Sequence, residues 1–249
     1  MKTLRHLLLG PAILCGALPS SAQFATRDYV PMSFIQTQPA YFPQSAMGMG
    51  LVSGEARISI QIDDSGRLTD YLAVAYSHPV FLNAAITAIK TWQFKPALVH
   101  GASRSATAVL DFTFKAGVVV VDLSIETIPE LVRSKLAIGA MSFRVCTLSE
   151  LDKIPTPTKI VKPIYTPDQA RRSHVSHVTV EFYIDEEGHV RLPSVSRQTN
   201  EAAEELCAAA ITAVEQWQFE PPVSRGRPVL VLAQQDFDFR SAPPDRKLP

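Results

Sequence analysis

The chain has 249 residues, with 24 basic and 24 acidic side chains, and 46% of its residues are hydrophobic. This hydrophobic content excludes wholesale disorder. The lack of net positive charge argues against a nucleic-acid partner, which would require a basic face. The length is sufficient for two small hydrophobic cores.

The first residues are typical of an export signal. Lys2 and Arg5 precede an apolar run from Leu7 to Leu18, and small residues ending at Ala22 follow. We predict that residues 1–22 are a signal peptide cleaved after Ala22, which would leave 22 basic and 24 acidic residues in the mature chain. The run is shorter than the roughly 20 apolar residues that span a membrane, and a retained anchor is the alternative.

One sequence pattern occurs twice. It consists of an approach segment, a turn ending in glycine, a Trp-Gln-Phe-x-Pro motif and a Phe-x-Phe strand end. The matching pairs are Pro39–Pro43 with Pro163–Pro167, Arg57–Gly66 with Thr179–Gly188, Trp92–Pro96 with Trp217–Pro221, and Phe112–Phe114 with Phe237–Phe239. This repeat is far longer than the roughly 20 to 50 residues of a solenoid unit. The chain therefore contains two related modules.

Each copy is predicted to begin with a β-hairpin. Alternating apolar residues predict strands at 57–63 and 178–184, and each returns after the turn glycine Gly66 or Gly188. We expect the return strands at 68–76 and 189–196.

A helix and a final strand are predicted after each hairpin. Ser77 with Pro79, and Asn200 with Glu201, are typical helix starts. The predicted apolar helix faces are Leu82, Ile86, Ile89 and Trp92 in the first copy, and Cys207, Ile211, Val214 and Trp217 in the second. Final strands are expected at 106–114 and 230–239. The predicted fold class is α+β, with two tandem small β-β-α-β modules, each an antiparallel sheet with one covering helix.

The predicted organisation is a domain at 35–115, a connecting segment at 116–155, a domain at 156–240 and a disordered tail at 241–249. The connecting segment contains an apolar run at 118–121, a candidate helix at 129–136 and a candidate strand at 143–146. It either extends the first module or bridges the two. Residues 156–158 are expected to be linker.

No catalytic chemistry is predicted. The sequence contains no nucleophile, phosphate-loop or dinucleotide motif, and hairpin geometry explains the acidic turns at Asp63 and Asp185, so we expect no enzyme, no cofactor and no metal. Trp92 and Trp217 are predicted to be core residues. Cys146 and Cys207 could form a disulfide in an oxidising compartment, or each could pack as a small hydrophobe.

The ordered set of a proline and aromatic approach, a turn ending Asp-x-x-Gly, Trp-x-Phe-x-Pro and Phe-x-Phe resembles the carboxy-terminal domain of TonB. TonB is the periplasmic protein that couples inner-membrane energy to outer-membrane transporters. The resemblance implies a periplasmic protein, anchored to the inner membrane only if the signal is retained. Unlike a TonB energy transducer, this chain has no proline-rich spacer, and it has two domains rather than one.

The resemblance also implies how partners bind, because in this family an extended peptide adds itself to the sheet beside the final strand. The expected partner is a protein or peptide, either an outer-membrane transporter or an inner-membrane energising complex, and a second copy of this chain is a further candidate. The expected partner-binding residues in the second copy are Tyr165, Pro167, Gln169, Leu230, Val231, Leu232, Ala233 and Gln235. The alternative is a periplasmic structural adaptor with no energy-transducing role.

Overall fold

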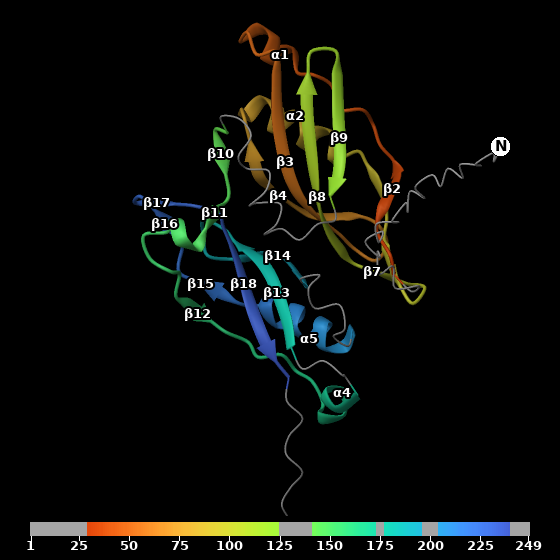
Figure 1. The fold of residues 1–249 in the computed structure, drawn as a ribbon, viewed down its shortest axis with the longest axis vertical. Helices are drawn as coiled ribbons and strands as arrows, with labels where there is room; N and C mark the ends of the chain where they lie inside the picture. The colour runs from red at the N-terminus through yellow and green to blue at the C-terminus, as the bar shows by residue number, and fades with distance from the viewer. Residues whose placement is uncertain (1–28, 125–140, 173–176, 196–203, 240–249) are drawn as a thin grey trace, which may run out of the picture.

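The computed structural model describes residues 29–124, 141–172, 177–195 and 204–239 (Figure 1). These residues combine helices with mainly antiparallel sheets, in agreement with the predicted α+β class. The predicted signal peptide, the candidate helix at 129–136, the helix start at Asn200 and the predicted tail lie outside them. Within the described ranges, no helix is long and apolar enough to cross a membrane.

The first copy is built on a five-stranded sheet with the order β10-β4-β3-β8-β9, in which all neighbours are antiparallel. Helix α2 (Pro79–Ile89) covers one face of this sheet, on which Ile58, Ile60 and Ile62 are buried. The strands are β3 (Ser53–Ile62), β4 (Leu68–Tyr76), β8 (Ala106–Lys115), β9 (Val118–Ser124) and β10 (Phe143–Arg144).

The second copy is built on a four-stranded sheet with the order β11-β18-β13-β14, in which β11 alone runs parallel to its neighbour. Helix α5 (Glu204–Val214) covers the face that buries Val178, Val180 and Phe182. The strands are β11 (Cys146–Thr147), β13 (His177–Ile184), β14 (Val190–Val195) and β18 (Val231–Asp238).

Short elements complete both copies. They are β1 (Tyr29–Val30), β2 (Ser33–Gln36), α1 (Gln44–Gly48), β5 (Gln93–Lys95), β6 (Ala97–Val99), β7 (Ala102–Arg104), the 3₁₀ helix η1 (Leu148–Glu150), β12 (Pro157–Lys159), α4 (Pro167–Arg172), β15 (Gln218–Phe219), β16 (Val223–Ser224) and β17 (Arg227–Pro228). The expected linker at 156–158 is wrong, because β12 pairs with β15 and the Thr156 carbonyl accepts a hydrogen bond from Glu220 N at 2.8 Å.

The buried helix faces differ from the predicted ones by about one position. In the first copy Phe81, Ala85, Ala88 and Ile89 are buried, whereas Leu82 and Ile86 are only partly buried. The matching residues of α5 are Leu206, Ala210, Ala213 and Val214. The small alanines let each helix lie close to its sheet, and this preference for small residues is invisible to an apolar pattern. The cap of α2 is His78, whose Nδ1 accepts from Val80 N, rather than Ser77.

The repeated motifs contact one another in the same way in both copies. The two tryptophans are each 8% exposed, which confirms them as core residues, and their Nε1 atoms donate to the carbonyls of Gln38 (2.8 Å) and Val161 (2.7 Å) on the approach segments. The turn glycines have φ angles of +82° and +90° and lie against the carbonyls of Phe94 and Phe219. The Trp-x-Phe motif therefore connects the approach segment, the helix end and the hairpin turn.

The two copies pack against each other through the sheet faces that the helices leave uncovered. A third buried cluster joins them and consists of Val74, Val109, Val145, Tyr183, Leu192 and Leu230. At its edge Arg191 Nε donates to Asp70 Oδ2 at 2.9 Å, and a second, shorter bond links the same two side chains. Burial raises the pKa of Tyr183, whose neighbours across the interface include Ser59 and Arg57.

The five-residue segment 143–147 links the two sheets, because its first residues pair with one sheet and its last residues pair with the other. Phe143 and Arg144 pair with β4, and Cys146 and Thr147 pair with β18. Val145 N donates to the Val74 carbonyl at 2.7 Å, while the next amide, on Cys146, donates to the Leu230 carbonyl at 2.9 Å. The strand predicted at 143–146 is thus present, and the connecting segment both extends the first sheet and bridges the two copies.

Candidate functional site

In the first copy, strands from the connecting segment occupy both edges of the sheet. The family-type final strand β8 pairs with β3 on one side and, from Val109 to Lys115, with β9 on the other. At the opposite edge β10 pairs with β4, and the ring of Phe143 stacks on Tyr76 with a centroid distance of 5.1 Å. An extended partner therefore has no access to the outer side of β8 along most of its length.

In the second copy, the equivalent strand remains largely unpaired on its outer side. Strand β18 pairs with β13 along its whole length, but with β11 only at Val231 and Leu232. From Ala233 to Asp238, no strand of the described ranges pairs with the outer side. We call Ala233–Asp238 the open edge.

The open edge begins at Ala233 because β11 stops at Thr147. A capping box turns the chain away there, with Glu150 Oε2 accepting from Thr147 N at 2.9 Å. Arg144 also donates to Glu150, at 2.9 Å through Nη1, and this contact, followed by that of Thr147, lowers the pKa of Glu150 to about 2. Glu150 is thus held ionised, and it fixes where the intramolecular strand ends.

The residues predicted to bind a partner fall at two ends of β18. Leu230 and Val231 are buried and Leu232 lies in the ladder with β11, whereas Ala233 and Gln235 belong to the open edge. Val231 and Asp238 are seven residues apart, which is about 23 Å at about 3.3 Å per residue. The structure therefore does not bring the whole predicted set together.

Tyr165, Pro167 and Gln169 lie at the end where β18 finishes. The Tyr165 ring packs edge-on against Phe239, with centroids 4.9 Å apart. Pro167 begins α4, and Gln169 Oε1 accepts from Thr166 N at 2.6 Å while Gln169 N donates to Thr166 Oγ1 at 3.2 Å. Gln169 thus completes a capping box for α4.

The structure aligns the two approach segments differently, by one residue, from the sequence alignment of the copies, which pairs Tyr41 with Tyr165. Tyr41 is 76% exposed, whereas Phe42 packs edge-on against Phe81 at 5.7 Å. The aromatic side chain that enters the core of the first copy, as Tyr165 does in the second, is therefore Phe42.

A group of polar residues beside the open edge was not predicted. Asp236 Oδ1 accepts from Thr179 Oγ1 at 2.7 Å, and Asp238 Oδ1 lies 3.0 Å from His177 Nδ1. The hydrogen bond to Asp238, and then the charge of Asp236, raise the pKa of His177. The alternation of Asp236 and Asp238 with Phe237 and Phe239 was the signal for these residues, because it places both carboxylates on one sheet face.

The acidic turns match each other as hairpin elements. Asp63 Oδ1 accepts from Ser65 N and Arg67 N, both at 2.9 Å, and Asp185 Oδ1 accepts from Glu187 N at 3.2 Å and His189 N at 2.8 Å. Ligand atoms of Asp185, Glu187 and His189 lie within 4.8 Å of one another. Hairpin geometry accounts for this cluster, because Asp185 holds the turn amides.

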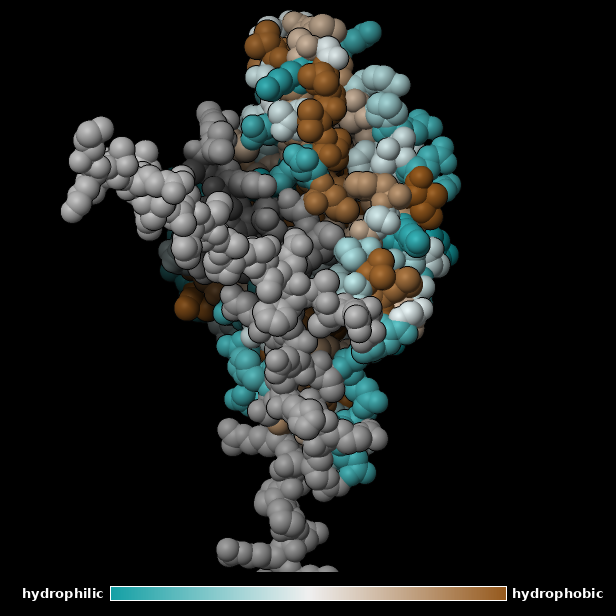
Figure 2. All heavy atoms as spheres, turned by 45° about the vertical axis from the view of Figure 1, so that its right-hand side comes forward, coloured by the Kyte–Doolittle hydropathy of each residue, from teal (hydrophilic) through white to brown (hydrophobic). Residues whose placement is uncertain are grey.

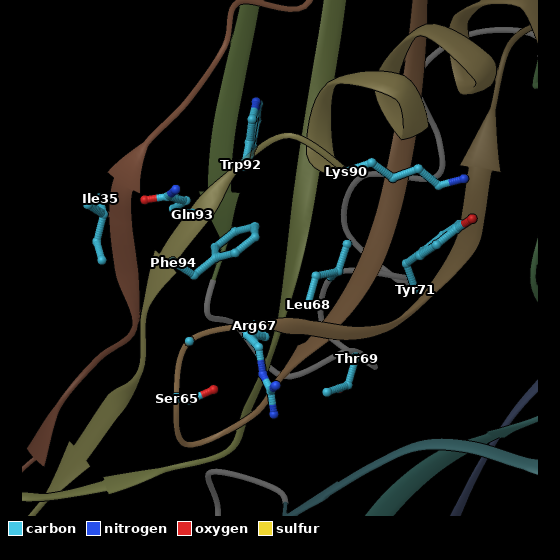
Figure 3. A pocket seen from close by; sticks show the side chains of 11 residues that line it. Ile35, Ser65, Arg67, Leu68, Thr69, Tyr71, Lys90, Trp92, Gln93 and Phe94 are labelled. Atoms are coloured by element: carbon cyan, nitrogen blue, oxygen red, sulfur yellow. The ribbon is translucent and has the colours of Figure 1, made fainter.

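A groove of about 550 Å³ lies in the first copy between the hairpin turn, β2 and the end of α2 (Figure 3). Its two cations already have partners. The Lys90 ammonium lies 5.5 Å from the centre of the Tyr71 ring, and the Arg67 guanidinium pairs with Asp63 at 2.8 Å. The groove therefore presents no pair of cations converging on a ligand.

The two cysteines are free thiols, and both pack against the core of the second copy. Burial is the main cause that raises the pKa of each thiol. Their environment is that of small hydrophobic side chains.

The sequence comparisons agree with this geometry. The family described as Gram-negative bacterial TonB protein C-terminal matches the chain twice, over residues 38–116 and 161–241. The chain therefore belongs to this family and contains two tandem copies, as predicted. It is a TonB-like protein linked to TonB-dependent transport, and the family is non-enzymatic. A search of curated proteins finds no match.

Proposed function

We propose that this periplasmic TonB-like protein binds an extended segment of a partner protein by strand addition to the open edge, in connection with transport across the outer membrane. In this proposal, residues 35–115 and 156–240 are the two domains, residues 116–155 connect them, and the second domain binds. The observation that carries the proposal is the contrast between two outer strand sides. That of β8 is paired from Val109 to Lys115, whereas no strand of the described ranges pairs with that of β18 from Ala233 to Asp238.

Strand addition suits this edge for a physical reason. Unpaired amides and carbonyls supply main-chain hydrogen bonds, and alternate side chains supply selectivity. A partner strand on the open edge would continue the line of β11 and would meet α4 at the far end, where Tyr165 and Gln169 are held. Outer-membrane transporters, whose segments the family binds, are the proposed partners.

Photo-cross-linking in the native periplasm tests this proposal. A photoreactive residue replaces Gln234 or Asp236, both of which are exposed on the open edge. The matched control replaces Thr113 in the first copy, where β9 occupies the outer side. We expect cross-links to transporter segments from the two edge positions and none from the control. Equal labelling from Thr113, or no transporter product at all, would contradict the proposal.

Proline substitution tests the role of the backbone. Successive amides of a strand point to opposite sides, so one of Gln234→Pro and Gln235→Pro removes an outward amide and the other removes a bond to β13. We expect the outward variant to keep its circular dichroism spectrum and to lose at least about tenfold in partner affinity. A folded outward variant with unchanged affinity would exclude strand addition here.

The buried contact between the copies favours a second candidate, a structural adaptor without a transport role. An adaptor whose edges are permanently satisfied would protect the outward amides of Ala233–Asp238, those not bonded to β13, from hydrogen exchange in the native assembly. Rapid exchange of these amides that slows only when a transporter segment is added would exclude this alternative.

A further inference from the structure

The outer side of β9 is a second exposed strand edge, distinct from the open edge of β18. Strand β9 ends the sheet of the first copy, and no strand of the described ranges pairs with its outer side. It lies just beyond residue 116, where the first family match ends. It is therefore an addition to the family domain.

Among the described residues, this edge has few of the features that normally discourage pairing between proteins. Edge strands are usually protected by charges, by proline or by a covering element. Strand β14, the outermost strand of the second sheet, carries Arg191 and Pro193. In contrast, β9 has four consecutive valines, and Asp122 is its only charged residue.

The solvent-facing valines extend an apolar surface. Val118 and Val120 are 54% and 49% exposed, whereas Val119 and Val121 pack on the core. Figure 2, which brings this side of the molecule forward, shows hydrophobic side chains gathered in a strip on the first copy.

We infer that the outer side of β9 pairs with β9 of a second copy of this chain, in antiparallel orientation about a two-fold axis. The valine run of β9 is self-complementary, because antiparallel pairing of two copies can set Val119, Val120 and Val121 of one copy against the same three residues of the other. Centring the axis on Val120 sets the two exposed Val120 side chains against each other. It also places Asp122 of each copy opposite Val118 of the other, so the like charges stay apart.

Charge supports this register. Lys115 pairs with Val118 across β8 and β9, so both side chains lie on the same face of the sheet. Asp122 of the second copy, opposite Val118, would enter that same row. The interface thus aligns one cation and one carboxylate on each side of the axis.

The first test is the self-association of the full chain, measured by sedimentation equilibrium over a range of concentrations. We expect a monomer–dimer equilibrium, and V120K should raise its dissociation constant at least about tenfold, because the two introduced lysines face each other on the axis. The matched control is I164K, which changes an exposed isoleucine of the second copy. A chain that stays monomeric, or a dimer equally sensitive to both variants, would overturn the inference.

Disulfide trapping tests the register. In a chain whose three cysteines are alanine, V120C faces its own counterpart at about 4.5 to 5.5 Å between Cα atoms, which a disulfide can span. V118C lies about 13 Å from its counterpart, four residues along the strand, and should link instead to D122C in a mixed sample. Equal trapping by V118C and V120C alone would overturn ordered pairing. Cross-linking at Gln234 tests the open edge independently of either result.

Discussion

The two copies share one architecture, but they differ in what occupies the outer side of the final strand. In the first copy β9 covers β8 over seven residue pairs, whereas in the second copy β11 covers β18 at two. The cores, the tryptophan bonds and the turn contacts are nearly the same. A duplicated domain can thus lose the free outer side of its final strand without changing its core.

The largest effect should come from the turn glycines, which the copies share. Alanine at Gly66 or Gly188 would place a Cβ 2.1 Å from a Phe carbonyl at a positive φ, and we expect each variant to lower the free energy of unfolding by about 3 kcal/mol. Gly101→Ala and Gly226→Ala are matched controls with positive φ and open space, and should cost about 1 kcal/mol. Urea denaturation measures all four. Equal costs would show that backbone strain, not the close approach, sets the effect.

The second prediction concerns β9, the strand that covers β8, and weakens its packing on the core. Val119→Ala with Val121→Ala deletes the core contacts of β9 and should cost about 2 kcal/mol. Hydrogen exchange of the outward β8 amides should then accelerate toward that of the open edge. Val118→Ala with Val120→Ala, measured in dilute protein, changes the exposed face of the same strand and should cost below about 0.5 kcal/mol. Unchanged exchange in the first variant would show that β9 is held by other contacts.

A smaller effect is expected where the copies meet. A double-mutant cycle on Arg191 and Asp70 should give a coupling energy of about 1 kcal/mol, because the pair is bidentate but only half-buried. The exposed pair Lys153 and Glu220 is the control, and it should couple more weakly. No coupling between Arg191 and Asp70 would mean that the apolar cluster alone joins the copies.

The smallest effect concerns His177 beside the open edge. Its folded-state pKa is raised, so its contribution to stability is present below the unfolded pKa of about 6.5 and is lost as pH rises through the folded value. NMR titration should show that Asp238→Asn lowers the pKa of His177 more than Asp236→Asn does, because the Asp238 contact is shorter. The reverse order would contradict the assigned contacts.

The alternation of apolar residues along the sequence predicted the hairpins well. The return strand of the first copy runs from Leu68 to Tyr76 as expected, because period-two alternation and a turn glycine are local signals. The helix faces were displaced, since Ala85 and Ala210 are buried by close packing that an apolar pattern does not reveal. Three of the eight predicted partner-binding residues, Leu230, Val231 and Leu232, are buried or paired with β11, which the sequence did not indicate for a similar reason. Pairing of β11 with Val231 joins residues far apart in sequence, and no local signal reports it.

The segment at 143–147 has a mechanical consequence. The amide of Val145 bonds to the first sheet and the next amide, on Cys146, bonds to the second, so no flexible residues separate the two attachments. A pull exerted on the second copy along β18 would therefore reach the first copy as shear across backbone hydrogen bonds, and not through a compliant tether. Backbone hydrogen bonds resist shear best when several carry the force together. Here β10 is bonded to the first sheet and β11 to the second, within one short segment of chain. Tension taken up at one copy would thus be shared by the other.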